Sequence, residues 1–335
     1  MIDRRRFTVM MGLGASVPLG AAAVPGAKPS GGKVRFDQLH SSSVPGEVRI
    51  SIYTPPGYGA TAGRLYPLLL LLHGGNGSEQ DLLRFAPTLD EAMIEARVPP
   101  FVVAMPSARR SLYMDYKDGS QRWETLIIAE LLPHLRKSLQ VSAERQGTFV
   151  GGWSMGGLGS LRLAFKHPDL FAAVAALEPA IEPALSWSEI GPHVRFWRPA
   201  ELMQEMFGSP IDTTFWEDNN PATLAKRDPG RLLGLGIYLD VGDQDMLYLY
   251  EGTEFLHRIL FDARLAHEYR LVHGADHVGP SLEPRIADAI GFIGRQIRSP
   301  DWIDPTVLKT RAGMDEQKRR IGMPVDAVDP RRIKG

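Results

Sequence analysis

The sequence predicts an α/β fold, with a mostly parallel central sheet and helices on both faces, and three observations lead to this prediction. Short apolar runs of strand length alternate with longer segments that carry apolar residues at helical spacing. Several of the short runs are unbroken, which is typical of parallel strands buried on both faces. A chain of 335 residues, 44% of them hydrophobic and 23% charged, is long enough to bury such a sheet.

The expected elements follow one another in βα order. We expect strands at residues 48–53, 68–72, 101–105, 146–150, 171–177, 236–241 and 268–272. We expect helices at residues 82–96, 123–139, 158–167, 254–266 and 284–297. Repeated βα units of this kind build a parallel sheet with helices on each side.

One long segment, residues 182–233, interrupts this alternation because it contains no predicted strand. It is rich in aromatic residues, namely Trp187, Phe196, Trp197, Phe207, Phe215 and Trp216. We interpret it as an insertion over the carboxyl edge of the sheet, where ligands bind in such folds. The alternative is that these aromatic side chains form only the insertion's own small core.

The N-terminus has the layout of an export signal. A cluster of arginines at residues 4–6 precedes Phe7 and an uncharged run, residues 8–23, which is followed by small residues up to Ala27. This pattern resembles a twin-arginine signal, so we expect residues 1–27 to direct export to a periplasmic or extracellular location. A membrane anchor is the alternative, but the run is shorter than the roughly 20 strongly apolar residues that a span requires.

Charge and cysteine content exclude several classes of function. The formal net charge is -1, from 38 basic and 39 acidic residues, and gives no footprint for nucleic acid or for an anionic membrane. The sequence has no cysteine, which excludes disulfides, a thiol nucleophile, a thiolate zinc site and a lipid-modified cysteine. The composition does not predict an oligomeric state.

The motif G-W-S-M-G-G at residues 152–157 places Ser154 between an apolar run and a helical segment. A serine at a sharp turn from strand to helix has a strained backbone, and small flanking residues let its hydroxyl project from the sheet. Because a hydroxyl is a weak nucleophile, a histidine held by a carboxylate must activate it. Ser154 is therefore the predicted nucleophile, and an idle serine in a glycine-rich turn is the alternative.

The base and the acid are expected downstream, in the chain order serine, acid, histidine. His277 lies in the loop after the last predicted strand and is the preferred base, with His273 in reserve. The turn G-D-Q-D at residues 242–245 offers Asp243 and Asp245 as the acid. Either carboxylate would fix the tautomer of the histidine and stabilise its charged form.

Attack by the serine on a carbonyl group creates an oxyanion, which also requires hydrogen-bond donors. The backbone N–H of Met155 follows the serine directly, and the loop H-G-G-N at residues 73–76 offers Gly75 as the second donor. His73 itself is expected to be structural, and the alternative for the loop is an ordinary turn.

These motifs resemble the esterase D family of α/β-hydrolases, which includes S-formylglutathione hydrolases, feruloyl esterases, enterochelin esterases and mycolyltransferases. The similarity covers about residues 48–297. It rests on residues 152–157 and 242–245, with support from Y-T-P-P-G-Y at 53–58, W-E at 123–124, E-L-L-P at 130–133, S-L-Y-M-D at 111–115, F-W at 215–216 and N-P at 220–221. After Gly274, D-H-V-G replaces the family's usual aromatic-flanked histidine segment.

The resemblance implies an α/β-hydrolase fold, and it favours Asp245 as the acid because the carboxylate follows the strand-end glycine by three residues. It implies a serine esterase that acts on a small-molecule ester without metal or organic cofactor. An acyltransferase that moves the acyl group to a sugar or another alcohol is the alternative, and a non-catalytic binding protein is disfavoured by the complete residue set. Residues 28–300 would form the catalytic domain, and residues 301–335 a charged C-terminal tail.

Overall fold

A computed structural model of the chain describes residues 31–300, 302–325 and 333. The predicted export signal, residues 1–27, lies outside the described residues. Within the described ranges, no helix has the length and apolar character that crossing a membrane requires.

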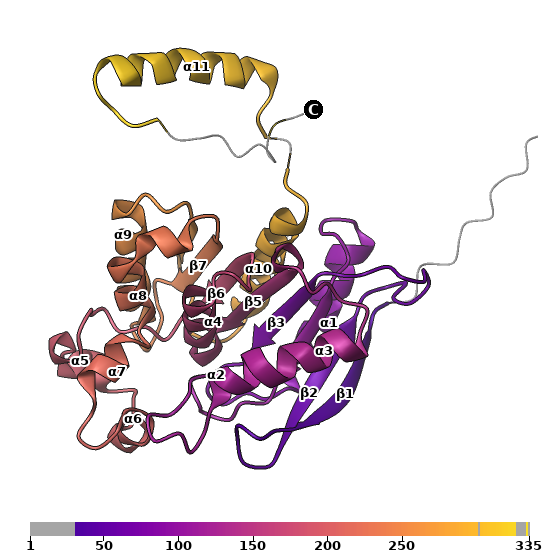
Figure 1. Ribbon diagram of the computed structural model, residues 1–335, viewed down its shortest axis with the longest axis vertical. Helices are drawn as coiled ribbons and strands as arrows, with labels where there is room; N and C mark the ends of the chain where they lie inside the picture. The colour runs from indigo at the N-terminus through magenta and orange to yellow at the C-terminus, as the bar shows by residue number, and fades with distance from the viewer. Residues whose placement is uncertain (1–30, 301, 326–332, 334–335) are drawn as a thin grey trace, which may run out of the picture.

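The centre of the molecule is an eight-stranded sheet with the strand order β1-β2-β4-β3-β5-β6-β7-β8 (Figure 1). Two pairings, β1 with β2 and β2 with β4, are antiparallel, and the other five are parallel. This confirms the predicted mostly parallel sheet. The strands are β1 (Lys33–His40), β2 (Glu47–Thr54), β3 (Leu68–Leu72), β4 (Val102–Pro106), β5 (Thr148–Trp153), β6 (Ala173–Leu177), β7 (Gly236–Gly242) and β8 (Glu268–Val272).

Helices cover both faces of the sheet. The helices α1 (Asp81–Ile94) and α10 (Leu282–Ile297) pack on one face and on each other. The opposite face carries α4 (Met155–Lys166), α9 (Leu249–Asp262) and a continuous helical segment made of α2 (Trp123–Thr125), the π-helical turn η1 (Leu126–Leu131) and α3 (Leu132–Ser138). A short 3-10 turn, η2 (Arg145–Gly147), leads into β5.

The leucine run of β3 shows why the central strands have no polar residues. Leu68, Leu70 and Leu72 belong to the core on the α4 side, whereas Leu69 and Leu71 belong to the core on the α1 side. Successive strand side chains point to opposite faces, so a strand covered by helices on both sides must be apolar at every position. Burying each leucine contributes about 2 kcal/mol, which makes this strand a strong anchor for the loop that follows it.

The insertion, residues 182–233, is wholly described and contains only short helices. These are η3 (Trp187–Glu189), α5 (Pro192–Arg195), α6 (Ala200–Phe207), α7 (Thr213–Glu217), α8 (Pro221–Arg227) and η4 (Pro229–Leu232). It begins where β6 ends, at the carboxyl edge of the sheet, and α8 packs against α4 and α9. Some of its aromatic residues form a core within the insertion, where Trp187 packs against Trp216 and Phe207 packs against Phe215. Phe196 instead contacts Tyr248, which lies outside the insertion.

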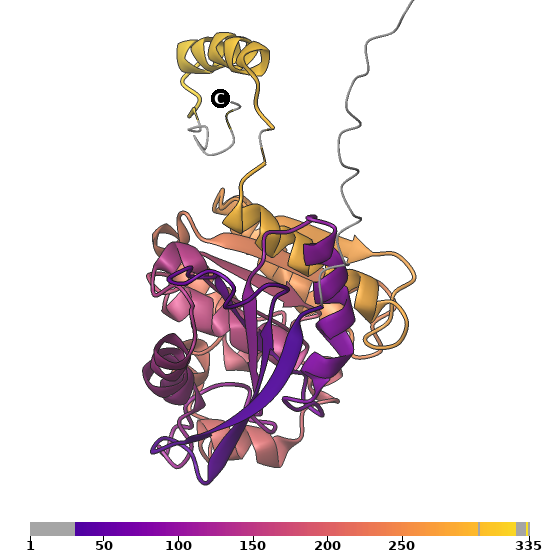
Figure 2. The same cartoon turned by 90° about the vertical axis from the view of Figure 1, so that its right-hand side faces the viewer.

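Outside the insertion, a strand and a long helix were not predicted. The strand β1 is an edge strand in which Phe36 is exposed, while Val34 and Leu39 are only partly buried against the core. The helix α11 (Pro305–Arg320) stands away from the sheet in both views (Figures 1 and 2). It is polar on nearly all sides, but Asp304 caps its first turn by accepting a hydrogen bond from the N–H of Val307. Local capping rather than a buried face therefore supports this helix.

Candidate active site

Ser154 lies at the sharp turn between β5 and α4. Its backbone angles are φ 55° and ψ -118°, a conformation that non-glycine residues rarely adopt. The neighbouring chain holds this conformation in place, because the Ser154 N–H donates to the carbonyl of Leu177 and the Ser154 carbonyl accepts from Ala180. The strain that the motif predicted is present, and the turn directs the serine out of the sheet.

The glycines of the motif are required by close packing. A methyl group on Gly156 would lie 2.0 Å from the carbonyl oxygen of Leu72, and one on Gly152 would lie 2.5 Å from the same oxygen. Both distances are far below van der Waals contact, so any larger residue would push the turn away from β3. The turn is thus tied to the strand that precedes the predicted oxyanion loop.

The structure brings Ser154, His277 and Asp245 together. His277 Nε2 is 3.1 Å from Ser154 Oγ, and His277 Nδ1 is 2.9 Å from Asp245 Oδ2. His277 is 9% exposed and Asp245 is 1% exposed. The three residues follow β5, β8 and β7, whose carboxyl ends meet at one edge of the sheet. The hydrogen bonds form a continuous path from a buried carboxylate to the serine hydroxyl.

The alternative residues form a separate pair. Asp243 Oδ2 lies 2.7 Å from His273 Nδ1, and Asp243 Oδ1 accepts from the N–H of Gly274. The His273 side chain is 97% exposed. Asp243 therefore braces the turn after β8, while Asp245 contacts His277 and accepts from the N–H of Leu247.

The two predicted oxyanion donors belong to segments next to the serine. Met155 is the first residue of α4, so its N–H lies at the positive end of a helix of 12 residues. A methyl group on Gly74 would be only 3.6 Å from Ser154 Cβ, which places the loop containing Gly75 next to the serine.

His73 is structural, as expected. Its Nδ1 is 2.7 Å from the carbonyl of Gly74, and its Nε2 accepts from the N–H of Ala108 at 2.9 Å. These two bonds place the ring proton on Nδ1. Tyr113, in the loop that the sequence pointed out at residues 111–115, donates its hydroxyl to the carbonyl of His73. The His73 ring thus holds the loop around Gly75 against the loop after β4.

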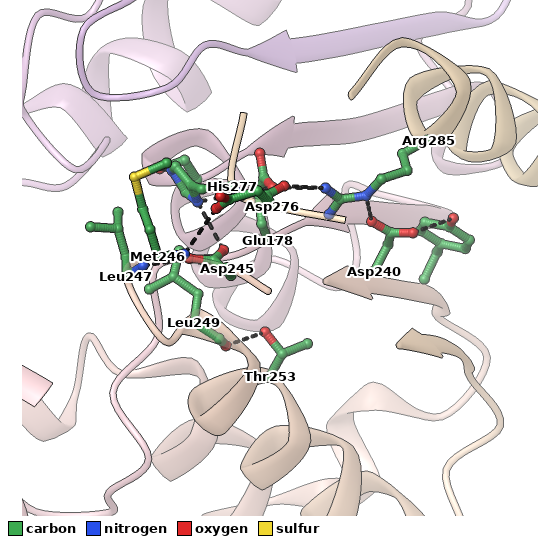
Figure 3. Close-up of polar contacts among 12 residues, drawn as sticks. Glu178, Asp240, Asp245, Met246, Leu247, Leu249, Thr253, Asp276, His277 and Arg285 are labelled. Carbon is green, nitrogen blue, oxygen red and sulfur yellow. Dashed lines mark hydrogen bonds and ion pairs between the residues drawn. The ribbon is translucent and has the colours of Figure 1, made fainter. Parts of the chain in front are cut away.

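Sequence reasoning missed a buried charged cluster beside His277 (Figure 3). Glu178 follows β6 directly, and its Oε2 is 3.9 Å from His277 Nδ1. Arg285 of α10 lies between Glu178 and Asp240, and its Nη1 donates to Glu178 Oε2 at 2.9 Å. The available signal was the position of Glu178, because it ends a central strand at the same edge as Ser154 and Asp245.

The electrostatics of the site favour a charged His277. Burial opposes the charged imidazole, but the hydrogen bond to Asp245 and the charge of Glu178 outweigh it and raise the pKa of His277 above 6.5. Burial raises the pKa of Glu178 to about 7, although the charges of His277 and Arg285 act in the opposite direction. A carboxyl group whose pKa is raised to about 7 therefore lies 3.9 Å from an imidazole whose pKa is also raised.

Glu178, Asp245 and His277 also have the donor types of a metal site, and their ligand atoms lie within 4.8 Å of one another. Each of these groups already has a partner in the protein: Glu178 Oε2 accepts from Arg285, and Asp245 Oδ2 lies against His277 Nδ1.

Four exposed apolar side chains are joined to the site by sequence adjacency or by a ring contact, and we call them the apolar rim: Phe196, Met246, Tyr248 and Val278. Met246 and Tyr248 follow the acid in sequence, Val278 follows the histidine, and Phe196 of the insertion contacts the Tyr248 ring at 5.8 Å. Each of the four side chains is about half exposed. Grouped apolar exposure of this kind is typical of a surface that receives an apolar ligand.

A family model with the description "Putative esterase" matches residues 41–285, well over half of the chain. The protein belongs to this esterase family.

Among curated relatives, the chain is 32% identical over 144 residues to Esterase Rv1288 of Mycobacterium tuberculosis. That match covers 42% of this chain and 31% of the relative, so the chain spans about a third of the relative's length. It is also 32% identical over 113 residues to an acetyl esterase of Caldicellulosiruptor saccharolyticus, covering 34% of this chain and 41% of the relative. A third match, 30% identical over 132 residues, is to the diacylglycerol acyltransferase/mycolyltransferase Ag85A of Mycobacterium leprae, covering 36% of this chain and 38% of the relative.

Solved structures show the same fold. A ferulic acid esterase superposes with a TM-score of 0.67 at 19% identity, covering 80% of this chain and 99% of that one. The S-formylglutathione hydrolase FrmB from Staphylococcus aureus superposes with a TM-score of 0.63 at 19% identity, covering 79% of this chain and 99% of that one. These similarities confirm the predicted α/β-hydrolase fold, and family membership supports an ester-hydrolysing enzyme.

Proposed function

We propose that this protein is a serine esterase that cleaves a carboxylic ester through an acyl intermediate on Ser154. The observation that carries the proposal is the hydrogen-bonded path from Asp245 through His277 to the hydroxyl of Ser154, which lies on a strained turn. This arrangement of nucleophile, base and orienting acid is the one that acyl transfer to a serine requires.

In the first half of the proposed reaction, Ser154 Oγ attacks the ester carbonyl and its proton passes to His277 Nε2. The negative charge that develops on the carbonyl oxygen accepts hydrogen bonds from the N–H groups of Met155 and Gly75. Asp245 stays ionised and stabilises the imidazolium through Nδ1. Collapse of the intermediate breaks the ester bond, and the imidazolium gives its proton to the departing alcohol.

In the second half, water attacks the acyl group on Ser154 while His277 Nε2 accepts a proton from that water. Collapse of this second intermediate releases the carboxylic acid, and the imidazolium returns its proton to Ser154 Oγ. The site begins and ends with a neutral histidine, so hydrolysis consumes only ester and water.

The apolar rim supports an ester with an apolar acyl or aryl group. Phe196 and Tyr248 lie edge to face and are both about half exposed, so a flat or extended apolar group can cover them. Each such contact contributes in proportion to the apolar area that it removes from water. We expect kcat/KM to rise with acyl length until the rim is covered.

The purified protein and Ser154→Ala, assayed on short and long p-nitrophenyl esters, test the proposal. We expect Ser154→Ala to lose about 10⁴-fold or more of the activity on every ester that the wild type cleaves. Equal activity in the two proteins would remove the serine mechanism. Circular dichroism spectra of both proteins control for folding.

Acyl transfer is a second candidate, and the match to the mycolyltransferase of Mycobacterium leprae favours it. Both activities use the same acyl-serine, and they differ only in whether water or another alcohol attacks it. Product analysis in the presence of a sugar separates them, because a transferase would form the sugar ester in excess of the free acid.

We also propose that the protein is exported by the twin-arginine route, because an arginine cluster precedes an uncharged run at the N-terminus. Fractionation of expressing cells tests this. Replacing Arg4 and Arg5 by lysine is expected to retain the protein in the cytoplasm, and unchanged export would contradict the route.

A further inference from the structure

Two carboxylates face the same nitrogen of His277. The role that we assign to the second carboxylate rests on the proposed esterase function. Asp245 Oδ2 is 2.9 Å from Nδ1, and Glu178 Oε2 is 3.9 Å from it. One carboxylate is enough to orient a catalytic histidine. Glu178 is fully buried, and its Oε1 has no hydrogen-bond partner among the described residues. Burying a partly satisfied charge is costly, so its presence at this point requires an explanation.

The backbone directs Glu178 to this position. Its φ of 38° is in the left-handed region, which non-glycine residues adopt at a cost. The residue comes immediately after β6, which lies between β5, ending directly before Ser154, and β7, ending before Asp245. The strained residue therefore points its carboxylate toward the site from the strand between the nucleophile and the acid.

Arg285 fixes the carboxylate from the other side (Figure 3). Its Nη1 donates to Glu178 Oε2 at 2.9 Å and to the carbonyl of Asp276 at 3.3 Å, and its Nε binds Asp240. Because Asp276 precedes His277 in the chain, one guanidinium connects Glu178 to the peptide that carries the histidine. Movement of Glu178 away from His277 would break this connection.

The charges around His277 do not balance when the imidazole is neutral. Glu178, Asp240 and Asp245 are three buried acids; Arg285 pairs with Glu178 and Asp240, and the charge of Arg270 also acts on Asp240. Asp276 is half-buried, and its carboxylate accepts from the N–H groups of Met246 and His277. A proton on His277 brings this cluster closer to neutrality, and that proton is the one that Ser154 releases during attack.

We propose that Glu178 is a second positioning residue for the reaction, which acts with Asp245 to stabilise the imidazolium of His277. The proton moves from Ser154 Oγ to His277 Nε2 and on to the departing alcohol, and Glu178 takes no proton in the step. Arg285 holds the carboxylate at the distance where its charge acts on the ring without competing with Asp245 for the Nδ1 hydrogen bond.

The pH profile of kcat/KM in Glu178→Gln tests the proposal. Removing a negative charge beside a histidine favours its neutral form, so we expect the acid limb to move to lower pH by about one unit. We also expect kcat on the plateau to fall about tenfold with KM unchanged, because the lost stabilisation belongs to the charged intermediate. A variant that loses thermal stability but keeps the wild-type profile would overturn the proposal.

Glu268→Gln is the matched control. Glu268 is also paired with an arginine of α10, Arg295, at 2.7 Å, but this pair is partly exposed and lies at the amino end of β8. The same substitution there is expected to leave the acid limb where it is. An equal displacement in both variants would show that the effect is not specific to Glu178, and would overturn the proposal.

The wild-type protein provides a test that does not depend on folding of the variant. Titration of the His277 ring signals by NMR is expected to give a pKa above that of a free imidazole, because the carboxylates of Asp245 and Glu178 both favour the charged ring. A pKa at or below the free value would contradict the proposal.

Failure of the proposed role of Glu178 can be distinguished from failure of the esterase proposal. An active Ser154→Ala removes the proposed function, whatever Glu178 does. An inactive Ser154→Ala combined with an unshifted profile in Glu178→Gln removes only the role of Glu178.

Discussion

Two histidine–aspartate pairs lie next to each other in this protein, and their difference shows what turns a hydrogen bond into a candidate catalytic site. His277 with Asp245 and His273 with Asp243 both join the loop after β8 to the loop after β7. Their N···O distances are similar, 2.9 Å and 2.7 Å. Distance alone therefore does not separate them.

Burial and a third partner separate the pairs. The side chain of His277 is 11% exposed and that of Asp245 is fully buried, whereas the His273 side chain is 97% exposed. Only His277 reaches the Ser154 hydroxyl. Water screens the charges of the exposed pair, while the buried pair acts on each other and on the serine with little screening. The exposed pair shapes the loop, and the buried pair faces the reacting atoms.

The largest expected difference is in kcat/KM, between variants of His277 and variants of His273. We expect His277→Gln to lower kcat/KM by about 10⁴- to 10⁶-fold, because among the described residues His277 is the base that is hydrogen-bonded to the Ser154 hydroxyl. His273→Gln is expected to leave kcat/KM nearly unchanged, since its ring lies in solvent. Steady-state kinetics on one p-nitrophenyl ester measures both. Similar losses in the two variants would mean that the comparison is wrong.

Variants of Asp245 and Asp243 are expected to differ somewhat less, in kcat. Asp245→Asn should lower kcat by about 10⁴-fold, because the amide supports the wrong tautomer of His277. Asp243→Asn should change kcat by less than about fivefold, because an exposed pair contributes little. A greater loss in Asp243→Asn than in Asp245→Asn would reverse the assignment of the acid.

Stability provides a third comparison, between a buried and an exposed arginine of α10. Arg285→Gln leaves Glu178 and Asp240 without their cation, so we expect the free energy of unfolding to fall by about 3–5 kcal/mol. Arg295→Gln breaks only a partly exposed pair, and the expected loss is about 1 kcal/mol or less. Urea denaturation measures both, and equal losses would contradict the buried network.

The smallest effect is the pH dependence of the wild-type enzyme. The reaction requires neutral His277, and its pKa is raised above 6.5 by the contact with Asp245 and Glu178. Activity is therefore expected to be present above this pKa and to fall about tenfold per pH unit below it. A pH profile of kcat/KM measures the midpoint. Undiminished activity at about pH 5 would show that His277 is not the base.

The sequence predicts the parts of the site that depend on short-range patterns. The glycines around Ser154 and the apolar run of β3 indicated the turn and the sheet, because both are consequences of local packing. The order of Ser154, Asp245 and His277 followed from the fold that these patterns predicted. Choosing Asp245 over Asp243 needed family resemblance, because two aspartates in one turn differ only in which way their side chains point.

The parts that depend on long-range contacts were not predicted. Glu178 and Arg285 are 107 positions apart, and no spacing in the sequence shows that they form an ion pair. The strand β1 was missed because its pairing with β2 depends on backbone hydrogen bonds at an exposed edge, where the apolar pattern is weak. The helix α11 was missed because it has no apolar face and depends on its cap.

Acyl-enzyme trapping tests the central claim most directly. The protein is mixed with a slowly hydrolysed p-nitrophenyl ester, quenched in acid during turnover, and examined by intact and peptide mass spectrometry. We predict a mass increase equal to one acyl group, located on the peptide that contains Ser154 and absent from Ser154→Ala. Hydrolysis that proceeds without an adduct, or with the adduct on another residue, would contradict the account.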